Sequence, residues 1–81
     1  MFFVYFLRCR DNTLYCGYTK DLDKRVATHN KGAGAKYTKR RRPVSLVYFE
    51  EYQTRSEAMR REYSLKQLSR KEKDEIISLG K

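Results

Sequence analysis

The stretch Phe2-Phe3-Val4-Tyr5-Phe6-Leu7 decides the fold. Aromatic and β-branched residues dominate it, and both favour a strand. Bulky side chains occupy every position rather than alternate ones, which is typical of a strand that is covered on both faces. We therefore expect this strand to lie in the middle of a sheet, with other elements packed above and below it.

A second strand follows after a short turn. Turn residues at 11–13 separate the first strand from a second one over Leu14–Thr19, so that the two form a hairpin. A three-residue loop pairs Arg10 with Leu14. This register has equal parity and places three residues on one face: Tyr5, Tyr15 and Gly17. A two-residue loop would put the two tyrosines on opposite faces.

Helix signals flank a third strand. Asp21 is a predicted N-cap for a helix over Leu22–Asn30, and a loop follows at 31–43. The third strand spans 44–52, with Val44, Leu46 and Tyr48 expected on one face. Capping-box signatures then start a helix from Thr54 to about Leu68, and another from Ser69 that ends before Gly80. The order ββαβαα predicts an α+β fold, a three-stranded antiparallel sheet flanked by helices.

Composition excludes several classes of protein. A chain of 81 residues is expected to be a single domain over 1–81, too small for a large enclosed cavity. Without an apolar run of about 20 residues or a signal-peptide pattern, we expect a cytoplasmic protein with no membrane span. Cys9, Cys16 and His29 fall short of a zinc site. The thiols are expected to be reduced, with an incidental disulfide across the hairpin as the alternative.

Three polar residues lie where packing prefers apolar ones. Arg25 and His29 share a helix face with apolar residues, and Glu62 lies on the buried side of the next long helix. Arg25 and Glu62 are either paired with each other, extended to the edge of the apolar surface, or lining a cleft. Lys66, four residues after Glu62, is another possible partner. His29 alone would more often be a solvated residue at a helix end.

The basic run at 36–42 points to a polyanionic partner. The net charge is +9, and such an excess commonly attracts nucleic acid. Five cations of one sign surround Tyr37 in this run: Lys36, Lys39, Arg40, Arg41 and Arg42. Either the run is a solvated loop, or it holds a phosphate backbone, and we favour the second interpretation. A membrane-surface protein is disfavoured, because no helix has a broad apolar face.

Phosphodiester cleavage uses the side-chain types found here. A divalent cation held by a carboxylate polarises the phosphate. An arginine stabilises the charge that develops on phosphorus-bound oxygens. A phenol or an imidazole accepts a proton from the attacking water, and Tyr5, Tyr15 and His29 all remain candidates for that role.

At these residues the sequence resembles the GIY-YIG nuclease superfamily, specifically its small stand-alone bacterial members. Phe3-Val4-Tyr5 stands at the GIY triplet and Tyr15-Cys16-Gly17 at the YIG triplet. The segment from Thr19 to Asn30 is similar to the first-helix motif of the family. Arg60-Arg61-Glu62 places Glu62 at the position of the metal-binding glutamate.

The resemblance implies an endonuclease that depends on Mg²⁺ or Mn²⁺. It implies that Tyr5 and Tyr15 flank the scissile phosphate, Arg25 stabilises the transition state and His29 assists proton transfer. Glu62 would hold the metal, and Gly17 would allow close backbone packing. The expected substrate is DNA rather than RNA, with a partner protein supplying targeting. The alternative is a catalytically silent nucleic-acid-binding module that acts through the basic loop 36–42.

Overall fold

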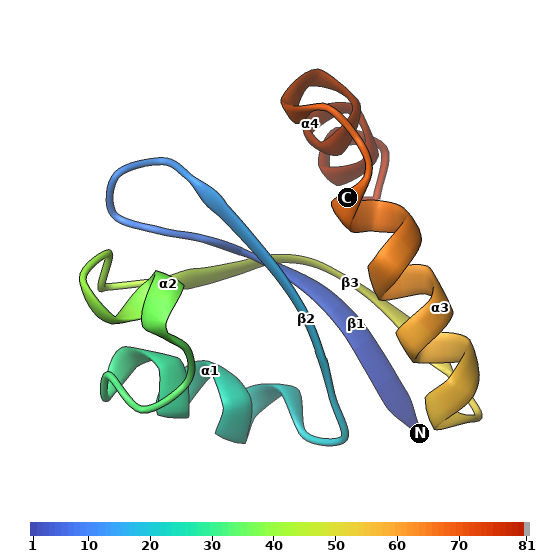
Figure 1. The fold of residues 1–81 in the computed structure, drawn as a ribbon, viewed down its shortest axis with the longest axis horizontal. Coiled ribbons are helices and arrows are strands. Elements are labelled where there is room, and N and C mark those ends of the chain that lie inside the picture. Colours follow the sequence, from blue (N-terminus) through green and yellow to red (C-terminus); the bar gives the residue numbers. More distant parts are fainter. Residues whose placement is uncertain (81) are drawn as a thin grey trace.

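The computed structural model describes residues 1–80, so that only position 81 of the predicted domain lies outside the described residues. Three antiparallel strands form one sheet in the order β2-β1-β3 (Figure 1). The strands are β1 (Phe2–Arg8), β2 (Leu14–Thr19) and β3 (Ser45–Tyr52). The prediction of an α+β fold with the first strand in the middle is therefore confirmed.

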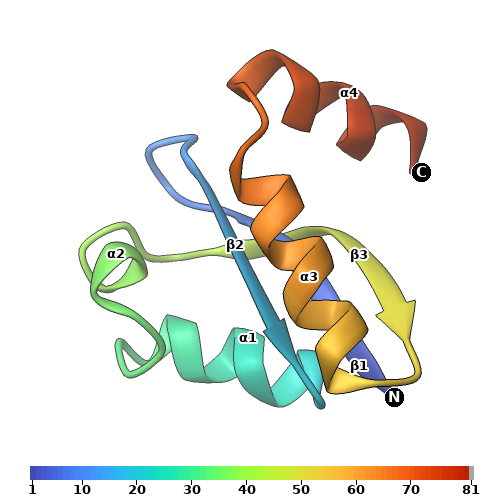
Figure 2. The same ribbon diagram turned by 45° about the vertical axis from the view of Figure 1, so that its right-hand side comes forward.

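Helices cover both faces of the sheet. The helices α1 (Leu22–Asn30) and α2 (Lys36–Lys39) lie on one face, and α3 (Arg55–Lys66) lies on the other, followed by α4 (Arg70–Leu79) (Figures 1 and 2). Their N-caps are the predicted ones, because the side chains of Asp21, Thr54 and Ser69 each accept a backbone N–H of the first turn. No helix in the described part of the chain is long and apolar enough to cross a membrane.

The central strand supplies a core to each face. Val4 and Phe6 are completely buried against Ala58 and Leu65 of α3. Tyr5 and Leu7 point to the opposite face, where residues of α1 pack against them. Each large side chain buried in this way stabilises the fold by about 1.5–3 kcal/mol. Because the alternation of β1 is strict, Tyr5 is directed toward α1.

The hairpin register differs from the predicted one by two residues. Arg8, not Arg10, pairs with Leu14, and the loop therefore has five residues, 9–13. The Cys9 N–H donates to the Thr13 carbonyl at 2.9 Å and Asn12 adopts a positive φ of 69°, so that the chain turns before the strands can extend. The shift preserves parity: Tyr5 pairs with Gly17, and Tyr15 faces the same side.

Other predicted details were wrong for local reasons. A bulge shifts the pairing so that Phe6 lies opposite Tyr48 and Leu7 opposite Leu46, and Tyr48 therefore packs on the opposite face from Leu46. The predicted disulfide alternative fails because Cys9 and Cys16 are free thiols buried in the cores of opposite faces.

A short helix interrupts the loop predicted at 31–43. It is α2, whose turn closes with a hydrogen bond from the Lys39 N–H to the Ala35 carbonyl at 3.1 Å. The side chain of Arg42 holds its C-terminal end, because its Nε donates to the Lys39 carbonyl at 2.8 Å. A glycine-rich basic stretch carries no periodic signal over four residues, which is why the pattern predicted a loop.

One ion pair fastens α3 to β3. The Arg61 guanidinium donates to both carboxylate oxygens of Glu50, at 2.8 and 3.1 Å, and the hydroxyls of Tyr48 and Tyr52 donate to the same carboxylate. Burial alone would raise the pKa of Glu50, but these donors outweigh it and bring the pKa to about 2. The carboxylate therefore stays ionised through the acid range in which most carboxyls are protonated.

We predict that Glu50 stabilises the protein at neutral pH and loses this effect in acid. Its pKa is about 2 in the folded state against 4.5 for an unperturbed glutamate, so the stabilisation is complete above 4.5 and disappears as the pH falls toward 2. Glu50→Gln should lower the free energy of unfolding at pH 7 by about 2 kcal/mol.

Thermal unfolding of both proteins between pH 7 and pH 2.5 checks this. The difference between wild type and Glu50→Gln should shrink as the pH falls, whereas the exposed neighbour Glu51→Gln should change little at any pH. A difference that stays constant across the range would contradict the prediction.

Candidate active site

The hydroxyl of Tyr5 is the centre of a buried polar cluster. Tyr5 is 1% exposed, and its oxygen lies 3.1 Å from Nε2 of His29. The Arg25 Nε donates to the same oxygen at 3.4 Å. Burial raises the pKa of Tyr5 to about 12, although the guanidinium of Arg25 opposes the rise. The phenol is therefore protonated at neutral pH.

His29 is completely buried at the end of α1. Its Nδ1 lies 2.8 Å from Oγ1 of Thr38, which α2 brings over the imidazole. Burial lowers the pKa of His29, and the charge of Arg25 lowers it further. The imidazole is thus neutral at pH 7. The interpretation of His29 as a solvated helix-end residue was wrong, because α2 covers it.

Tyr15 and Arg25 complete the convergence. The Tyr15 ring lies 5.1 Å from the His29 ring and 6.4 Å from the Tyr5 ring, centroid to centroid. The pKa of Arg25 is raised first by its hydrogen bond to Tyr5 and also by the phenol of Tyr15. The Nη2 of Arg25 donates to the Gly34 carbonyl at 3.3 Å. Two phenols and a guanidinium therefore meet over a neutral imidazole, and the shared face predicted for Tyr5 and Tyr15 is confirmed.

Two glycines allow this close packing. A Cβ atom at Gly17 would lie 2.5 Å from the hydroxyl oxygen of Tyr5, and one at Gly34 would overlap the ring of His29. Neither is needed for an unusual φ, so the requirement at both positions is steric. At Gly17 the close neighbour is the Tyr5 side chain.

Glu62 lies on α3, the helix that covers the other face of the sheet. Its side chain is 19% exposed and its Oε2 is 3.4 Å from Nζ of Lys66, the i,i+4 partner considered above. Of the alternatives for Glu62, the ion pair with Arg25 does not occur among residues 1–80. Helix α3 packs against β2, the strand that carries Tyr15, and the Lys66 partner of Glu62 lines a surface pocket together with Tyr15 and Cys16. Burial raises the pKa of the Cys16 thiol to about 12, and the charge of Glu62 raises it further.

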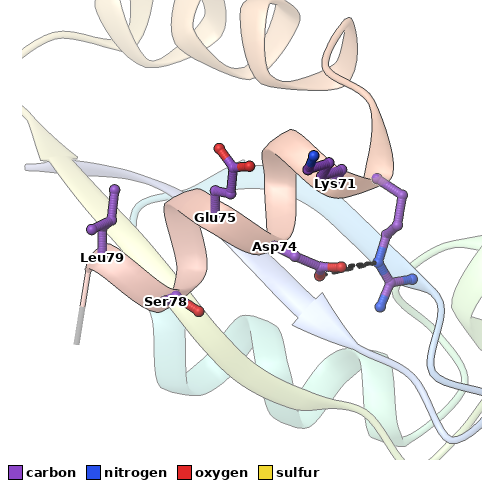
Figure 3. Close-up of a pocket in the computed structure, with 6 residues that line it drawn as sticks. Lys71, Asp74, Glu75, Ser78 and Leu79 are labelled. Atoms are coloured by element: carbon purple, nitrogen blue, oxygen red, sulfur yellow. Dashed lines mark hydrogen bonds and ion pairs between the residues drawn. The ribbon is translucent and has the colours of Figure 1, made fainter.

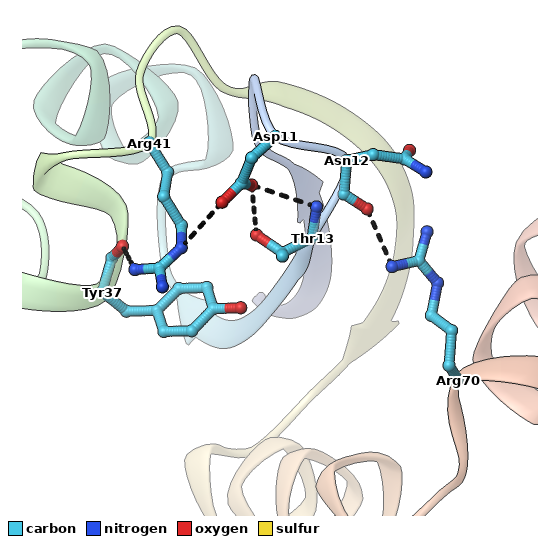
Figure 4. Close-up of polar contacts among 6 residues, drawn as sticks. All are labelled: Asp11, Asn12, Thr13, Tyr37, Arg41 and Arg70. Atoms are coloured by element: carbon cyan, nitrogen blue, oxygen red, sulfur yellow. Dashed lines mark hydrogen bonds and ion pairs between the residues drawn. The ribbon is translucent and has the colours of Figure 1, made fainter.

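The basic run divides into structural and free cations. Arg41 donates to Asp11 at 3.1 Å and to the Tyr37 carbonyl, while its guanidinium lies 4.1 Å above the Tyr37 ring (Figure 4). Arg42 donates to backbone carbonyls at the ends of α1 and α2. Within the described part of the run, exposed cationic side chains that form neither an ion pair nor a hydrogen bond remain at three positions: Lys36, Lys39 and Arg40.

The loop 9–13, which contains Asp11, also binds an arginine from the other face of the sheet. The Nη1 of Arg70, at the start of α4, donates to the Asn12 carbonyl at 2.7 Å (Figure 4). Arg41 and Arg70 thus hold the loop 9–13 from both faces of the sheet. The turn that connects the two tyrosine-bearing strands is braced by segments far from it in sequence.

A divalent cation beside β2 would have one carboxylate, Glu62, which lies in the α3 layer, whereas Tyr5 and Arg25 lie in the α1 layer. Within residues 1–80, no group of three or more His, Cys, Asp or Glu side chains is placed to hold a metal. Mg²⁺ often binds through one or two carboxylates, several waters and substrate phosphates. Glu62, partly buried and at the border of β2, fits that mode of binding.

The depression on α4 has a different character. Figure 3 shows that it is lined by residues of this helix, with Arg70 paired to Asp74 at 3.1 Å. It contains no phenol or imidazole, and Leu79 at its end is 86% exposed. We therefore place the candidate active site at Tyr5 and His29.

Sequence reasoning missed Thr38 and Gly34. Both contact the His29 ring, but each sits in a stretch that carries no helix or strand periodicity. The available signal was the glycine-flanked segment between two cationic stretches, which was interpreted through its charge alone.

Comparison with known proteins agrees with this geometry. The sequence matches the GIY-YIG catalytic domain over residues 1–75. It is 54% identical over 78 residues to a UPF0213 protein of Staphylococcus saprophyticus, covering 96% of this chain and 95% of that protein. A UPF0213 protein of Bacillus velezensis is 59% identical over 75 residues, or 93% of this chain and 76% of that one.

The chain belongs to the GIY-YIG family. Its fold is similar to the solution structure of a UPF0213 protein from Bacillus halodurans, with a TM-score of 0.63 and 46% identity over 98% of this chain and 85% of that one. A second solution structure, of a protein from E. faecalis, gives a TM-score of 0.64 and 42% identity over 95% and 82%. Membership of the GIY-YIG family implies a nuclease-like function and points to nucleic acid as the substrate.

We predict that Gly17→Ala disrupts the cluster of this GIY-YIG domain. The added methyl group must displace the Tyr5 hydroxyl, and overpacking of this kind costs about 1–3 kcal/mol. Denaturant unfolding of the variant measures this loss of stability.

A double-mutant cycle with Tyr5→Phe tests the cause. Removing the hydroxyl removes the atom closest to the new methyl group, so that Gly17→Ala should cost less stability in the Tyr5→Phe background. Equal costs in both backgrounds would show that the hydroxyl is not the source of the clash.

Proposed function

We propose that the protein is an endonuclease that hydrolyses phosphodiester bonds in DNA with one Mg²⁺ or Mn²⁺ ion. The observation that carries this proposal is the convergence of Tyr5, Tyr15 and Arg25 over a buried neutral imidazole. This arrangement combines a cation that binds phosphate with a hydrogen-bonded pair that accepts a proton. We place the activity in the cytoplasm, where thiols such as Cys9 and Cys16 stay reduced.

The Tyr5–His29 pair accepts the proton of the attacking water. The water gives a proton to the oxygen of Tyr5 as the phenol passes its own proton to Nε2 of His29. The water oxygen bonds to phosphorus, the bond from phosphorus to the leaving oxygen breaks, and that oxygen takes a proton from solvent. The imidazole then returns its proton through Tyr5. Tyr15 orients the phosphate from the exposed side of the cluster.

Arg25 stabilises the negative charge of the transition state. Its guanidinium is partly buried and fixed by Tyr5 and Gly34, so it needs little reorganisation when charge develops on the phosphate. Glu62 would hold the divalent ion, which when bound polarises the phosphate and neutralises the leaving oxygen. The Lys66 ammonium, now beside Glu62, would then be free to meet a phosphate.

We predict metal-dependent nicking of DNA that needs both Arg25 and Glu62. Supercoiled plasmid incubated with Mn²⁺ or Mg²⁺ should be converted to the open-circular form, and EDTA should stop the reaction. Arg25→Ala and Glu62→Ala should each reduce the rate by roughly 100-fold or more, the range seen when a single group that stabilises transition-state charge is removed.

Matched substitutions separate loss of chemistry from loss of fold. Glu75→Ala and Arg60→Ala replace an exposed acid and an exposed arginine on α4 and α3, and both should retain wild-type rates. Full activity in Arg25→Ala and Glu62→Ala would rule out the proposed chemistry. Binding of DNA without cleavage in any divalent ion would support the silent binding module instead.

We predict that the free cations of the basic run, Lys36, Lys39 and Arg40, bind the phosphate backbone. Replacing all three by alanine should weaken binding of every DNA sequence alike. It should also reduce the slope of log affinity against log salt by about 1 for each phosphate that the variant no longer binds. Fluorescence anisotropy with labelled DNA at several salt concentrations measures the slope.

An equal loss of charge elsewhere is the control for this test. Replacing Arg60, Lys71 and Lys31 by alanine removes the same three charges from other exposed positions. If the slope falls equally in both triple variants, net charge rather than the basic run determines binding.

A further inference from the structure

Thr38 contacts the side of His29 that faces away from Tyr5. It is completely buried, and it belongs to α2. Its Oγ1 lies 2.8 Å from Nδ1 of His29 and 3.1 Å from the carbonyl oxygen of Ala35. Both distances are those of good hydrogen bonds.

The direction of these bonds follows from the number of protons available. A carbonyl oxygen can only accept, so the single hydroxyl proton of Thr38 is committed to Ala35. Toward His29 the hydroxyl oxygen must then accept, which places a proton on Nδ1. A neutral imidazole carries one N–H, and Nε2 is left with a free lone pair.

The hydrogen bonds at Tyr5 agree with this direction. The Arg25 guanidinium can only donate, so the Tyr5 oxygen accepts from Arg25 and its own proton is directed to Nε2 of His29. In this series of hydrogen bonds, which runs from the Arg25 guanidinium to the Ala35 carbonyl, each donor has one acceptor. If the proton were on Nε2 instead, the Tyr5 oxygen would face two donors, Arg25 and His29. Nδ1 would then be an acceptor, and the Thr38 hydroxyl could donate to it only by giving up its hydrogen bond to Ala35.

We propose that Thr38 is the positioning residue of the hydrolytic site, because its hydroxyl keeps the imidazole proton on Nδ1 and leaves Nε2 free to accept the proton of Tyr5. The proposal deepens the function proposed above and rests on it for its catalytic consequence. Thr38 touches neither substrate nor reacting atoms, and acts through His29 alone.

The single histidine of the chain makes the test direct. Long-range ¹H–¹⁵N correlation spectra of the ¹⁵N-labelled protein at pH 7 show which imidazole nitrogen carries the proton. In the wild type we expect a protonated Nδ1 and an unprotonated Nε2. A wild-type spectrum with the proton on Nε2 overturns the proposal, whether or not the protein cuts DNA.

Variants at position 38 test the cause. Thr38→Val keeps the shape and removes the hydroxyl, so the proton should move at least partly to Nε2, and kcat should fall about 10- to 100-fold with little change in KM. Thr38→Ser retains the hydroxyl and should restore both the wild-type spectrum and the rate. A Thr38→Val spectrum with the wild-type proton position overturns the proposal.

Thr28→Val is the matched control. Thr28 lies on α1 and its hydroxyl donates to the Lys24 carbonyl at 2.8 Å, so this substitution also removes one bond from a hydroxyl to a carbonyl. It should leave the His29 spectrum and the rate unchanged. If Thr38→Val fails to fold, the wild-type spectrum and Thr38→Ser still decide the question. The expected spectrum without DNA cleavage would contradict the proposed nuclease function and leave the role of Thr38 toward His29 supported.

Discussion

The hydroxyl of Tyr5 needs hydrogen-bond partners inside the protein, and much of the surrounding structure provides them. The Tyr5 side chain is only 1% exposed, so its hydroxyl depends mainly on partners in the protein, and an unpaired buried hydroxyl costs about 1–3 kcal/mol. His29 and Arg25 supply the two partners from α1. The imidazole in turn requires a cover and a partner for its second nitrogen, and α2 provides both.

The two faces of the sheet have different roles. On the α1 side, the polar cluster is held by neutral hydrogen bonds around a single guanidinium. On the α3 side, Arg61 and Glu50 form a bidentate ion pair that ties the helix to β3, and two tyrosine hydroxyls donate hydrogen bonds to the same carboxylate. The first cluster carries the groups suited to hydrolysis, and the second fixes the helix from which Glu62 projects.

Sequence reasoning worked where a periodic pattern dictates the structure. The apolar run at 2–7, the capping boxes at Thr54 and Ser69, and the parity that joins Tyr5 to Tyr15 all depend on local rules, and all hold in the structure. Parity was also tolerant of error, since a loop two residues longer than expected left the same face shared. The bulge opposite Phe6 and Leu7 has no such signal, because the pairing register of β3 is not encoded by a local turn.

The remaining features depend on contacts across long stretches of sequence. His29 is covered by side chains from distant segments, among them Tyr5 and Thr38, and Arg41 is bound to Asp11, 30 residues away. Charge alone could not separate Arg41 and Arg42, which hold the backbone, from Lys36, Lys39 and Arg40, which do not. The position of Glu62 relative to Arg25 likewise could not be predicted, because it depends on how α3 and α1 pack against the edge strand β2 from opposite faces of the sheet.

The single turn of α2 has a mechanical consequence. Its inward face carries Thr38, and its outward face carries Lys36 and Lys39, with Arg40 directly after it. Like charges crowded on one turn repel each other, and counterions only partly screen them. A polyanion lying across the outer face would relieve that repulsion and tighten the turn. Binding of the substrate would then make the His29 imidazole more rigid, through the four residues of α2.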